Sequence, residues 1–137
     1  MQNKAINVLL VDDDNLNNLI STKYIKKYFV NSNITSCLNG KIAIDLITEK
    51  KVSQPAFVYD YILLDLNMPV MNGWEFLDNY RYLETDANEK PRIFLLTSSV
   101  HDEDIQRASR YPFVKDYVVK PLFSDKICKI FNLTEAQ

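Results

Sequence analysis

The chain has 137 residues, of which 47% are apolar and 25% are charged, and its formal net charge is −2. This length is enough for one hydrophobic core and too short for two ordinary domains, so we expect one globular domain. The nearly neutral charge argues against nucleic acid or a membrane surface as the main partner. No apolar run approaches the roughly 20 residues of a membrane span and no signal-peptide pattern occurs, so we expect a cytoplasmic protein.

The small number of glycines and cysteines further restricts the class of protein. Cys37 and Cys128 lie far apart among apolar neighbours, which favours buried free thiols over a disulfide. Gly40 and Gly73 are the two glycines of the chain. A P-loop or a dinucleotide-binding fingerprint needs more glycines than that, so nucleotide-binding enzymes built on those motifs are excluded.

The first strand and helix are expected at the start of the chain. Residues 5–11 are mostly apolar, which predicts a strand, and they run directly into Asp12, Asp13 and Asp14. Asn15 is the expected cap of the helix that follows. Apolar residues spaced mostly three or four apart predict the buried face of this helix: Leu16, Leu19, Ile20, Tyr24, Tyr28 and Phe29.

The second strand is expected at residues 34–38, near an edge of the sheet because two polar residues interrupt its apolar pattern. Asn39 and Gly40 then turn the chain into a second helix. Ala43, Leu46 and Ile47 are expected to face inward from this helix.

The third strand is expected in a short apolar run. Residues 61–64 read Tyr-Ile-Leu-Leu, which predicts a strand buried on both faces, and Asp65 follows at once. Met68-Pro69 and Asn72-Gly73 then mark a turn. A third amphipathic helix is expected from Gly73 to about Leu83.

The last third of the chain continues the same alternation. Its expected segments are a polar loop at 84–91, a strand at 92–96, a helix at 102–109, a strand at 114–119 and a helix at 125–131. Thr97 follows the fourth strand and Lys120 follows the fifth. Five strand–helix units predict an α/β domain with a doubly wound, five-stranded parallel sheet and helices on both faces.

Polar residues follow the strands where each one ends: Asp12 and Asp13, Asp65, Thr97 and Lys120. These ends lie along one edge of a parallel sheet, so we expect the side chains to converge there. Three carboxylates repel one another and need a cation, and a site with only oxygen ligands favours Mg²⁺. A lysine and a hydroxyl beside it suit a transferring phosphoryl group, which Asp65 could accept as a nucleophile.

These motifs together resemble the receiver domain of bacterial two-component response regulators, over about residues 5–131. The resemblance rests on four motifs in this order: Asp12-Asp13, Asp65-Leu66-Asn67-Met68-Pro69 with Met71-Asn72-Gly73, Leu96-Thr97-Ser98, and Tyr117-Val118-Val119-Lys120-Pro121. It implies a flavodoxin-like fold with strand order 2-1-3-4-5. It also implies a phosphoprotein rather than an enzyme with an external substrate, one that catalyses only its own phosphorylation and slow dephosphorylation.

The resemblance assigns the phosphoacceptor role to Asp65, with a histidine kinase or a histidine phosphotransfer protein as the donor. It implies that Asp13, Asp65 and the backbone carbonyl of Asn67 bind Mg²⁺ directly, and that Asp12 acts through water. Lys120 is expected to pair with the phosphoryl oxygens, and its bond to Pro121 is usually cis in this family.

The resemblance also implies a switch. Thr97 closes its hydroxyl on the phosphoryl group, and Tyr117 moves inward with it. This motion reshapes the face formed by the fourth helix, the fifth strand and the fifth helix, which signals to a downstream protein. Phosphorylation-dependent dimerisation through that face is a further expectation.

Two other function classes remain open at this stage. An aspartyl phosphatase is disfavoured because Asn67 stands where that class usually has a second aspartate. A degenerate receiver that only binds proteins is disfavoured because the acids, Lys120 and Thr97 are all present. The segment at residues 111–116 lacks the Gly-Ala pair that receivers often carry before the fifth strand. No output domain is apparent, so residues 1–137 are expected to be a single stand-alone receiver, like the chemotaxis regulators.

Overall fold

The structure is a computed structural model that describes residues 5–83, 91–99 and 101–133. In this part of the chain, strands and helices alternate strictly. In order, they are β1 (Asn7–Val11), α1 (Asn15–Tyr28), β2 (Asn33–Cys37), α2 (Gly40–Ser53), β3 (Tyr61–Asp65), α3 (Gly73–Leu83), β4 (Arg92–Thr97), α4 (Asp102–Ala108), β5 (Val114–Val119) and α5 (Ser124–Phe131). The alternation predicted from the sequence is confirmed, and the ends of the segments differ from the predicted ones by one or two residues.

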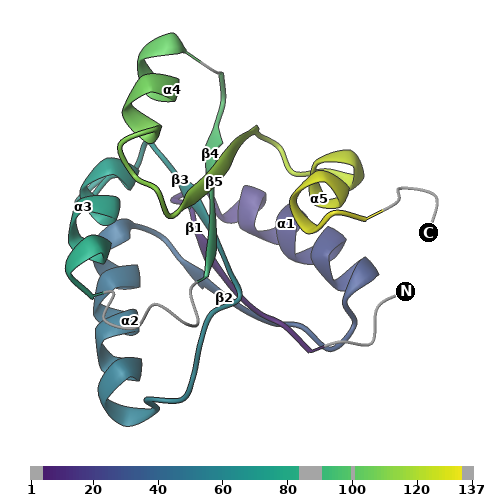
Figure 1. Cartoon of the computed structure of the whole chain (residues 1–137). Coiled ribbons are helices and arrows are strands. Elements are labelled where there is room, and N and C mark those ends of the chain that lie inside the picture. The colour runs from purple at the N-terminus through teal and green to yellow at the C-terminus, as the bar shows by residue number, and fades with distance from the viewer. Residues whose placement is uncertain (1–4, 84–90, 100, 134–137) are drawn as a thin grey trace.

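The strands form one parallel sheet in the order β2-β1-β3-β4-β5. Helices α1 and α5 cover one face of this sheet, and α2, α3 and α4 cover the other (Figure 1). The predicted doubly wound, flavodoxin-like fold is therefore confirmed, and β2 lies at an edge as expected. Among the described residues, no helix is long and apolar enough to cross a membrane.

Successive residues of the central strands point to opposite faces of the sheet and contribute to two hydrophobic cores. Leu9, Ile62 and Leu95 point toward the face of α2 and α3, where Phe76 and Leu77 meet them. On the other face the core is closed by side chains from α1 and α5, including Ile25, Tyr28, Ile127 and Phe131. Because both faces are covered, the central strands are apolar throughout, which produced the continuous runs seen in the sequence.

Helix α1 differs from the prediction in its cap and in its buried face. Asp14 is the N-cap and accepts the backbone N–H groups of Leu16 and Asn17, so the expected cap Asn15 is the first helical residue. Leu16 and Leu19 are 63% and 67% exposed. The buried residues of the helix are Asn18, Ser21, Ile25 and Tyr28. Tyr28 and the C-cap Phe29 are buried as predicted. Asn18 lies inside because its side-chain amide donates to the backbone carbonyl of Asp12 in the acidic loop.

The remaining local predictions agree with the structure. Asn39 caps α2 by accepting the N–H of Ile42. Of the residues expected to face inward, Ala43 and Ile47 are buried, and Leu46 is half-buried against the same core. Cys37 and Cys128 are buried and free. The loop expected at 84–91 lies outside the described residues except for its last residue.

Candidate acidic metal and phosphoryl site

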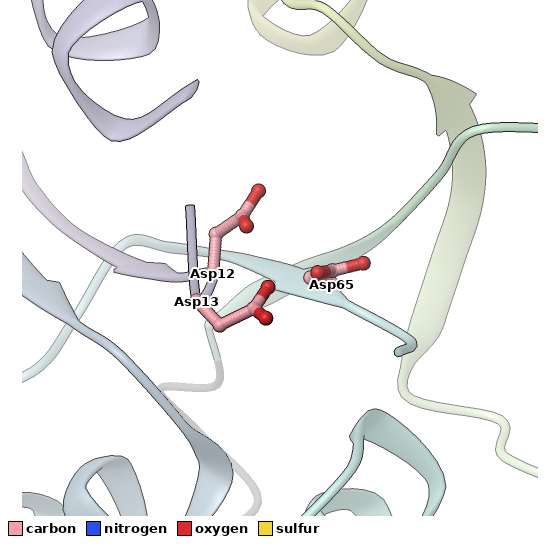
Figure 2. A group of neighbouring side chains, drawn as sticks. All are labelled: Asp12, Asp13 and Asp65. Atoms are coloured by element: carbon pink, nitrogen blue, oxygen red, sulfur yellow. The ribbon is translucent and has the colours of Figure 1, made fainter. Parts of the chain in front are cut away.

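Three carboxylates converge at the carboxyl edge of the sheet, as the sequence predicted. Asp12 and Asp13 follow β1, Asp65 ends β3, and one carboxylate oxygen of each lies within 4.8 Å of the others. Figure 2 shows the three side chains near one another at the ends of the two strands. Asp12 and Asp65 are buried and Asp13 is exposed, so the cluster opens to solvent on the side of Asp13.

Lys120 brings a positive charge to this cluster from the end of β5. Its Nζ lies 3.3 Å from Oδ2 of Asp12 and 3.3 Å from Oδ2 of Asp65. The backbone N–H of Lys120 donates to the carbonyl of Thr97, and the bond from Lys120 to Pro121 is cis. The Lys120 ammonium therefore forms ion pairs with two buried carboxylates. The third carboxylate of the cluster, Asp13, adds further negative charge beside them.

The pKa values of these groups are shifted by burial and by the excess of carboxylates over ammonium groups. Burial, followed by the negative charge of Asp12, raises the pKa of Asp65 from 3.8 to about 6. Burial also raises the pKa of Asp12, although the N–H of Asp14 and the charge of Lys120 act against it. Burial alone would lower the pKa of Lys120, but the two carboxylates outweigh it and the net shift is upward. Lys120 therefore stays charged, and the carboxylates hold excess negative charge that a cation would stabilise.

The donor set fits a hard divalent cation. Each of the three acids can supply an oxygen, and no histidine or cysteine belongs to the cluster among the residues that the structure describes. Oxygen ligands of this kind suit Mg²⁺, which usually keeps several water ligands and uses one or two carboxylates. Asn67 follows in the same loop, where its backbone N–H donates to Oδ1 of Asp65 at 3.3 Å.

The loop after β3 is held against the site by a close backbone contact. The N–H of Gly73 donates to the carbonyl of Leu66 at 3.0 Å. A Cβ on Gly73 would lie 2.6 Å from the carbonyl oxygen of Asp65, which no side chain could tolerate without displacing backbone. Gly73 is thus required for close packing, whereas the sequence suggested a role in the turn.

Thr97 and Tyr117 lie together at one small cavity, and in the described part of the chain the Thr97 hydroxyl is bonded to Ser99 rather than to an acid. The hydroxyl of Thr97 donates to the carbonyl of Ser99 at 2.6 Å and accepts the N–H of Ser99. Tyr117 is half-buried and, with Thr97, lines a small cavity under α4. Ser99 also shares a 3.0 Å hydrogen bond with His101, the single histidine of the chain, which is exposed.

One residue near the site was missed by the sequence analysis. Asn18, on the second turn of α1, is 5% exposed, and its Nδ2 donates to the backbone carbonyl of Asp12 at 3.0 Å. It thereby fixes the peptide that carries the first acid of the cluster. The sequence did show Asn18 six residues after Asp12, close enough to contact it. The apolar pattern nevertheless placed the buried face of α1 at other residues.

The comparisons with known proteins agree with this geometry. The family model described as response regulator receiver domain matches residues 8–132. The hybrid signal transduction histidine kinase I of Dictyostelium discoideum is 32% identical over 91% of this chain. The match takes up 7% of the length of that kinase.

Solved structures show the same relationship. A two-component response regulator from Cytophaga hutchinsonii has a TM-score of 0.81 and 30% identity, covering 96% of both chains. The receiver domain of the histidine kinase CKI1 from Arabidopsis thaliana, complexed with Mg²⁺ and BeF₃⁻, has a TM-score of 0.76 and 25% identity. That match covers 93% of this chain and 90% of the CKI1 chain. With its fold, its cluster of acids and a family match over most of its length, this chain belongs to the response regulator receiver domain family.

Proposed function

We propose that this domain accepts a phosphoryl group on Asp65 in a Mg²⁺-dependent reaction, and that a histidine kinase or a histidine phosphotransfer protein is the donor. The observation that carries the proposal is the convergence of Asp12, Asp13 and Asp65 around one space, with Lys120 3.3 Å from two of them. Such a site has a nucleophile, an excess of negative charge for a cation, and one fixed ammonium.

The metal in this proposal is held by the side chains of Asp13 and Asp65 and the backbone carbonyl of Asn67, with Asp12 acting through water. A bound Mg²⁺ supplies positive charge that lets a carboxylate and the oxygens of a phosphoryl group approach each other. The excess of carboxylates over ammonium groups in the cluster supports this assignment.

In the reaction, a carboxylate oxygen of Asp65 forms a bond to phosphorus while the bond from phosphorus to the donor imidazole nitrogen breaks. The freed nitrogen keeps the electron pair of that bond, and Asp65 becomes an acyl phosphate. Lys120 is already beside the acceptor carboxylate, where its ammonium can pair with the phosphoryl oxygens. Hydrolysis of the acyl phosphate by water returns the domain to its starting state.

The switch of the proposal involves Thr97 and Tyr117. In the present arrangement the Thr97 hydroxyl is bonded to the backbone of Ser99. We infer that a phosphoryl group on Asp65 competes for this hydroxyl, and that Tyr117 moves inward as Thr97 turns. The face formed by α4, β5 and α5 then changes its packing and signals to a partner protein.

The direct test is the intact mass of the protein after incubation with acetyl phosphate and Mg²⁺. We expect the wild type to gain one phosphoryl group, and we expect Asp65→Asn and an excess of EDTA each to abolish the gain. Asp14→Asn is the matched control, because Asp14 is exposed, lies next to the cluster and caps α1, and asparagine also caps helices well. It should be labelled like the wild type.

Two outcomes would contradict the proposal. A stable label on Asp65→Asn would place the acceptor on another residue. A folded wild type that takes up no label, although Mg²⁺ binds, would instead favour a receiver that acts only as a protein-binding module.

A further inference from the structure

Helix α4 is attached to the rest of the domain unevenly. None of its residues is buried, and its N-cap His101 makes no side-chain capping bond. A small cavity of about 10 Å³, hardly enough for one water molecule, lies beneath it. The cavity separates Ile105 and Ala108 of α4 from Leu95 and Tyr117 of the sheet. Within the described part of the chain, no hydrogen bond, ion pair or ring contact joins residues 102–106 to another element.

The carboxyl end of α4 is held firmly by α3. The guanidinium of Arg107 lies over the ring of Trp74, 4.6 Å from its centroid. Tyr111, which follows α4 and is 6% exposed, stacks on Trp74 with a centroid distance of 6.0 Å. Its hydroxyl donates to Oδ1 of Asp78 at 2.7 Å, and Arg81 lies over its ring at 4.9 Å.

A backbone contact completes this connection. Nη2 of Arg81 donates to the carbonyl of Arg110 at 3.3 Å. We call the five side chains the α3–α4 clasp: Trp74, Asp78, Arg81, Arg107 and Tyr111. The clasp involves two cation–π contacts, a ring stack and a hydrogen bond to a carboxylate, and each type of contact stabilises by a measurable amount.

We propose that the α3–α4 clasp is a hinge, which fixes the carboxyl end of α4 and leaves its amino end free to swing over the cavity. The inference goes beyond the proposed function, because the hinge exists without a phosphoryl group. Only the swing in response to phosphorylation rests on that function. Thr97, which lines the same cavity, is five residues before Asp102, the first residue of α4.

The position of the anchor decides which motion is available. A helix with contacts along its whole length could move only by sliding along its neighbours. A helix without contacts at either end would move away as a whole. Among the described residues, the hydrogen bonds and ring contacts with α3 lie at Arg107 and beyond it, while Asp104 and Ile105 border the cavity. Rotation about the carboxyl end is therefore the motion that breaks the fewest contacts. Ile105 borders the cavity, so the packing of α4 on the sheet is incomplete at this point.

Amide hydrogen exchange, measured residue by residue by NMR on the unphosphorylated protein, tests the hinge. The amides of Asp104 and Ile105 both donate to the carbonyl of His101 and report on the amino end. The amides of Ser109 and Tyr111, which donate to Ile105 and Ala108, report on the carboxyl end. We expect slower exchange at the carboxyl end in the wild type.

Two variants weaken the clasp without removing a buried apolar group. Arg107→Gln removes the cation over Trp74, and Tyr111→Phe removes the hydroxyl bonded to Asp78. We expect exchange of the Ser109 and Tyr111 amides to rise about two- to fivefold in the first and up to about tenfold in the second. The Asp104 and Ile105 amides should change little.

Arg110→Ala is the matched control, because Arg110 is an exposed neighbouring arginine for which the described structure gives backbone bonds only. It should leave both ends as in the wild type. Equal exchange at both ends of wild-type α4, or an effect of Arg107→Gln no larger than that of Arg110→Ala, would overturn the hinge.

Addition of Mg²⁺ and beryllofluoride, an analogue of the phosphoryl group, tests the swing. We expect the amide shifts of Asp104 and Ile105 to change more than those of Tyr111 and of the Trp74 indole. The opposite order would overturn the swing. A spectrum that the analogue leaves unchanged contradicts the proposed function instead, and the exchange comparison still decides on the hinge.

Discussion

Gly73 packs so closely on Asp65 that a Cβ at Gly73 would lie 2.6 Å from the Asp65 carbonyl oxygen. The same Cβ would lie 2.8 Å from Cα of Leu66, so the obstacle is backbone rather than a flexible side chain. We therefore expect Gly73→Ala to lower the free energy of unfolding by about 2–3 kcal/mol. Urea unfolding followed by circular dichroism measures the effect.

Gly40→Ala is the control for this prediction. A Cβ there would meet the Met71 carbonyl at 2.9 Å, but its other close neighbours are side-chain atoms of Met71 that can move. Gly40 also begins α2, where alanine favours the helix. We expect a smaller loss of stability than for Gly73→Ala, and a larger loss would show that crowding against Asp65 does not decide the choice of glycine.

The raised pKa of Asp65 makes the stability of the metal-free domain depend on pH. Since the pKa is about 6 in the folded state and near 3.8 ordinarily, the folded state holds the proton more tightly. Stability from this group is therefore greatest below about pH 4 and falls as the pH rises to about 6. One pKa unit corresponds to about 1.4 kcal/mol, so we expect Asp65→Asn to stabilise the domain by about 1–3 kcal/mol at pH 7.5.

The measurement is urea unfolding in EDTA at several pH values. The gain from Asp65→Asn should shrink toward zero near pH 4, where the wild-type carboxyl is protonated. Asp45→Asn serves as the control, because Asp45 is an exposed partner of Lys41 and should give no such gain. Added Mg²⁺ should stabilise the wild type more than Asp65→Asn. A pH-independent difference would mean that the charge on Asp65 is not the cause.

The fold followed from the sequence because each central strand is buried on both faces. Such strands are apolar without interruption, and their carboxyl ends are marked by the residues that the site needs, such as Asp65 and Lys120. The convergence of these residues required only the rule that parallel strands end at one edge. The strand order came from the resemblance to receiver domains, and it places β1 beside β3, so that Asp12 and Asp65 lie at the ends of neighbouring strands.

Helix α1 shows where sequence reasoning was insufficient. Apolar spacing indicated that Leu16 and Leu19 face inward, but the buried residues in this part of the helix are Asn18 and Ser21. The first turns of α1 lie over the acidic loop, where a buried amide can satisfy a backbone carbonyl and a leucine cannot. The clasp between α3 and α4 was also invisible, since Trp74 and Arg107 are far apart in sequence and meet only through the fold.

Val70 adopts a backbone conformation that valine rarely tolerates. Its φ is 68°, and the N–H of Met71 donates back to the carbonyl of Pro69 at 2.7 Å, which closes a tight three-residue turn. The Val70 side chain is 78% exposed, so little burial would be lost on its removal. We expect Val70→Gly to stabilise the domain by about 0.5–1 kcal/mol, because glycine reaches positive φ without strain.

Val70→Ala separates the backbone effect from the loss of the side chain. Alanine keeps a Cβ and therefore most of the strain at positive φ, so its thermal unfolding midpoint should stay close to that of the wild type. If both variants raised the midpoint equally, the exposed valine side chain rather than the backbone would be the source of the gain.

Asn18 provides a test of how the acidic loop is held. Its Nδ2 donates to the carbonyl of Asp12 in a buried position, so Asn18→Leu keeps the size of the side chain but frees the Asp12 peptide. If the acids bind Mg²⁺ as proposed, we expect about a tenfold loss of affinity, which is typical when a group that orients a ligand is removed. Trp74, the one tryptophan of the chain, reports the Mg²⁺ titration by fluorescence, with calorimetry as a second readout.

The neighbouring Asn17 gives the comparison that this test needs. Its Nδ2 donates to Oδ2 of Asp14, an exposed residue outside the acidic cluster, so Asn17→Ala should bind Mg²⁺ like the wild type. Equal affinities for Asn18→Leu and Asn17→Ala would mean that the Asp12 peptide keeps its place without the amide. A loss confined to Asn18→Leu, in a protein that still unfolds cooperatively, would show that a buried side chain on α1 orients the first acid of the cluster.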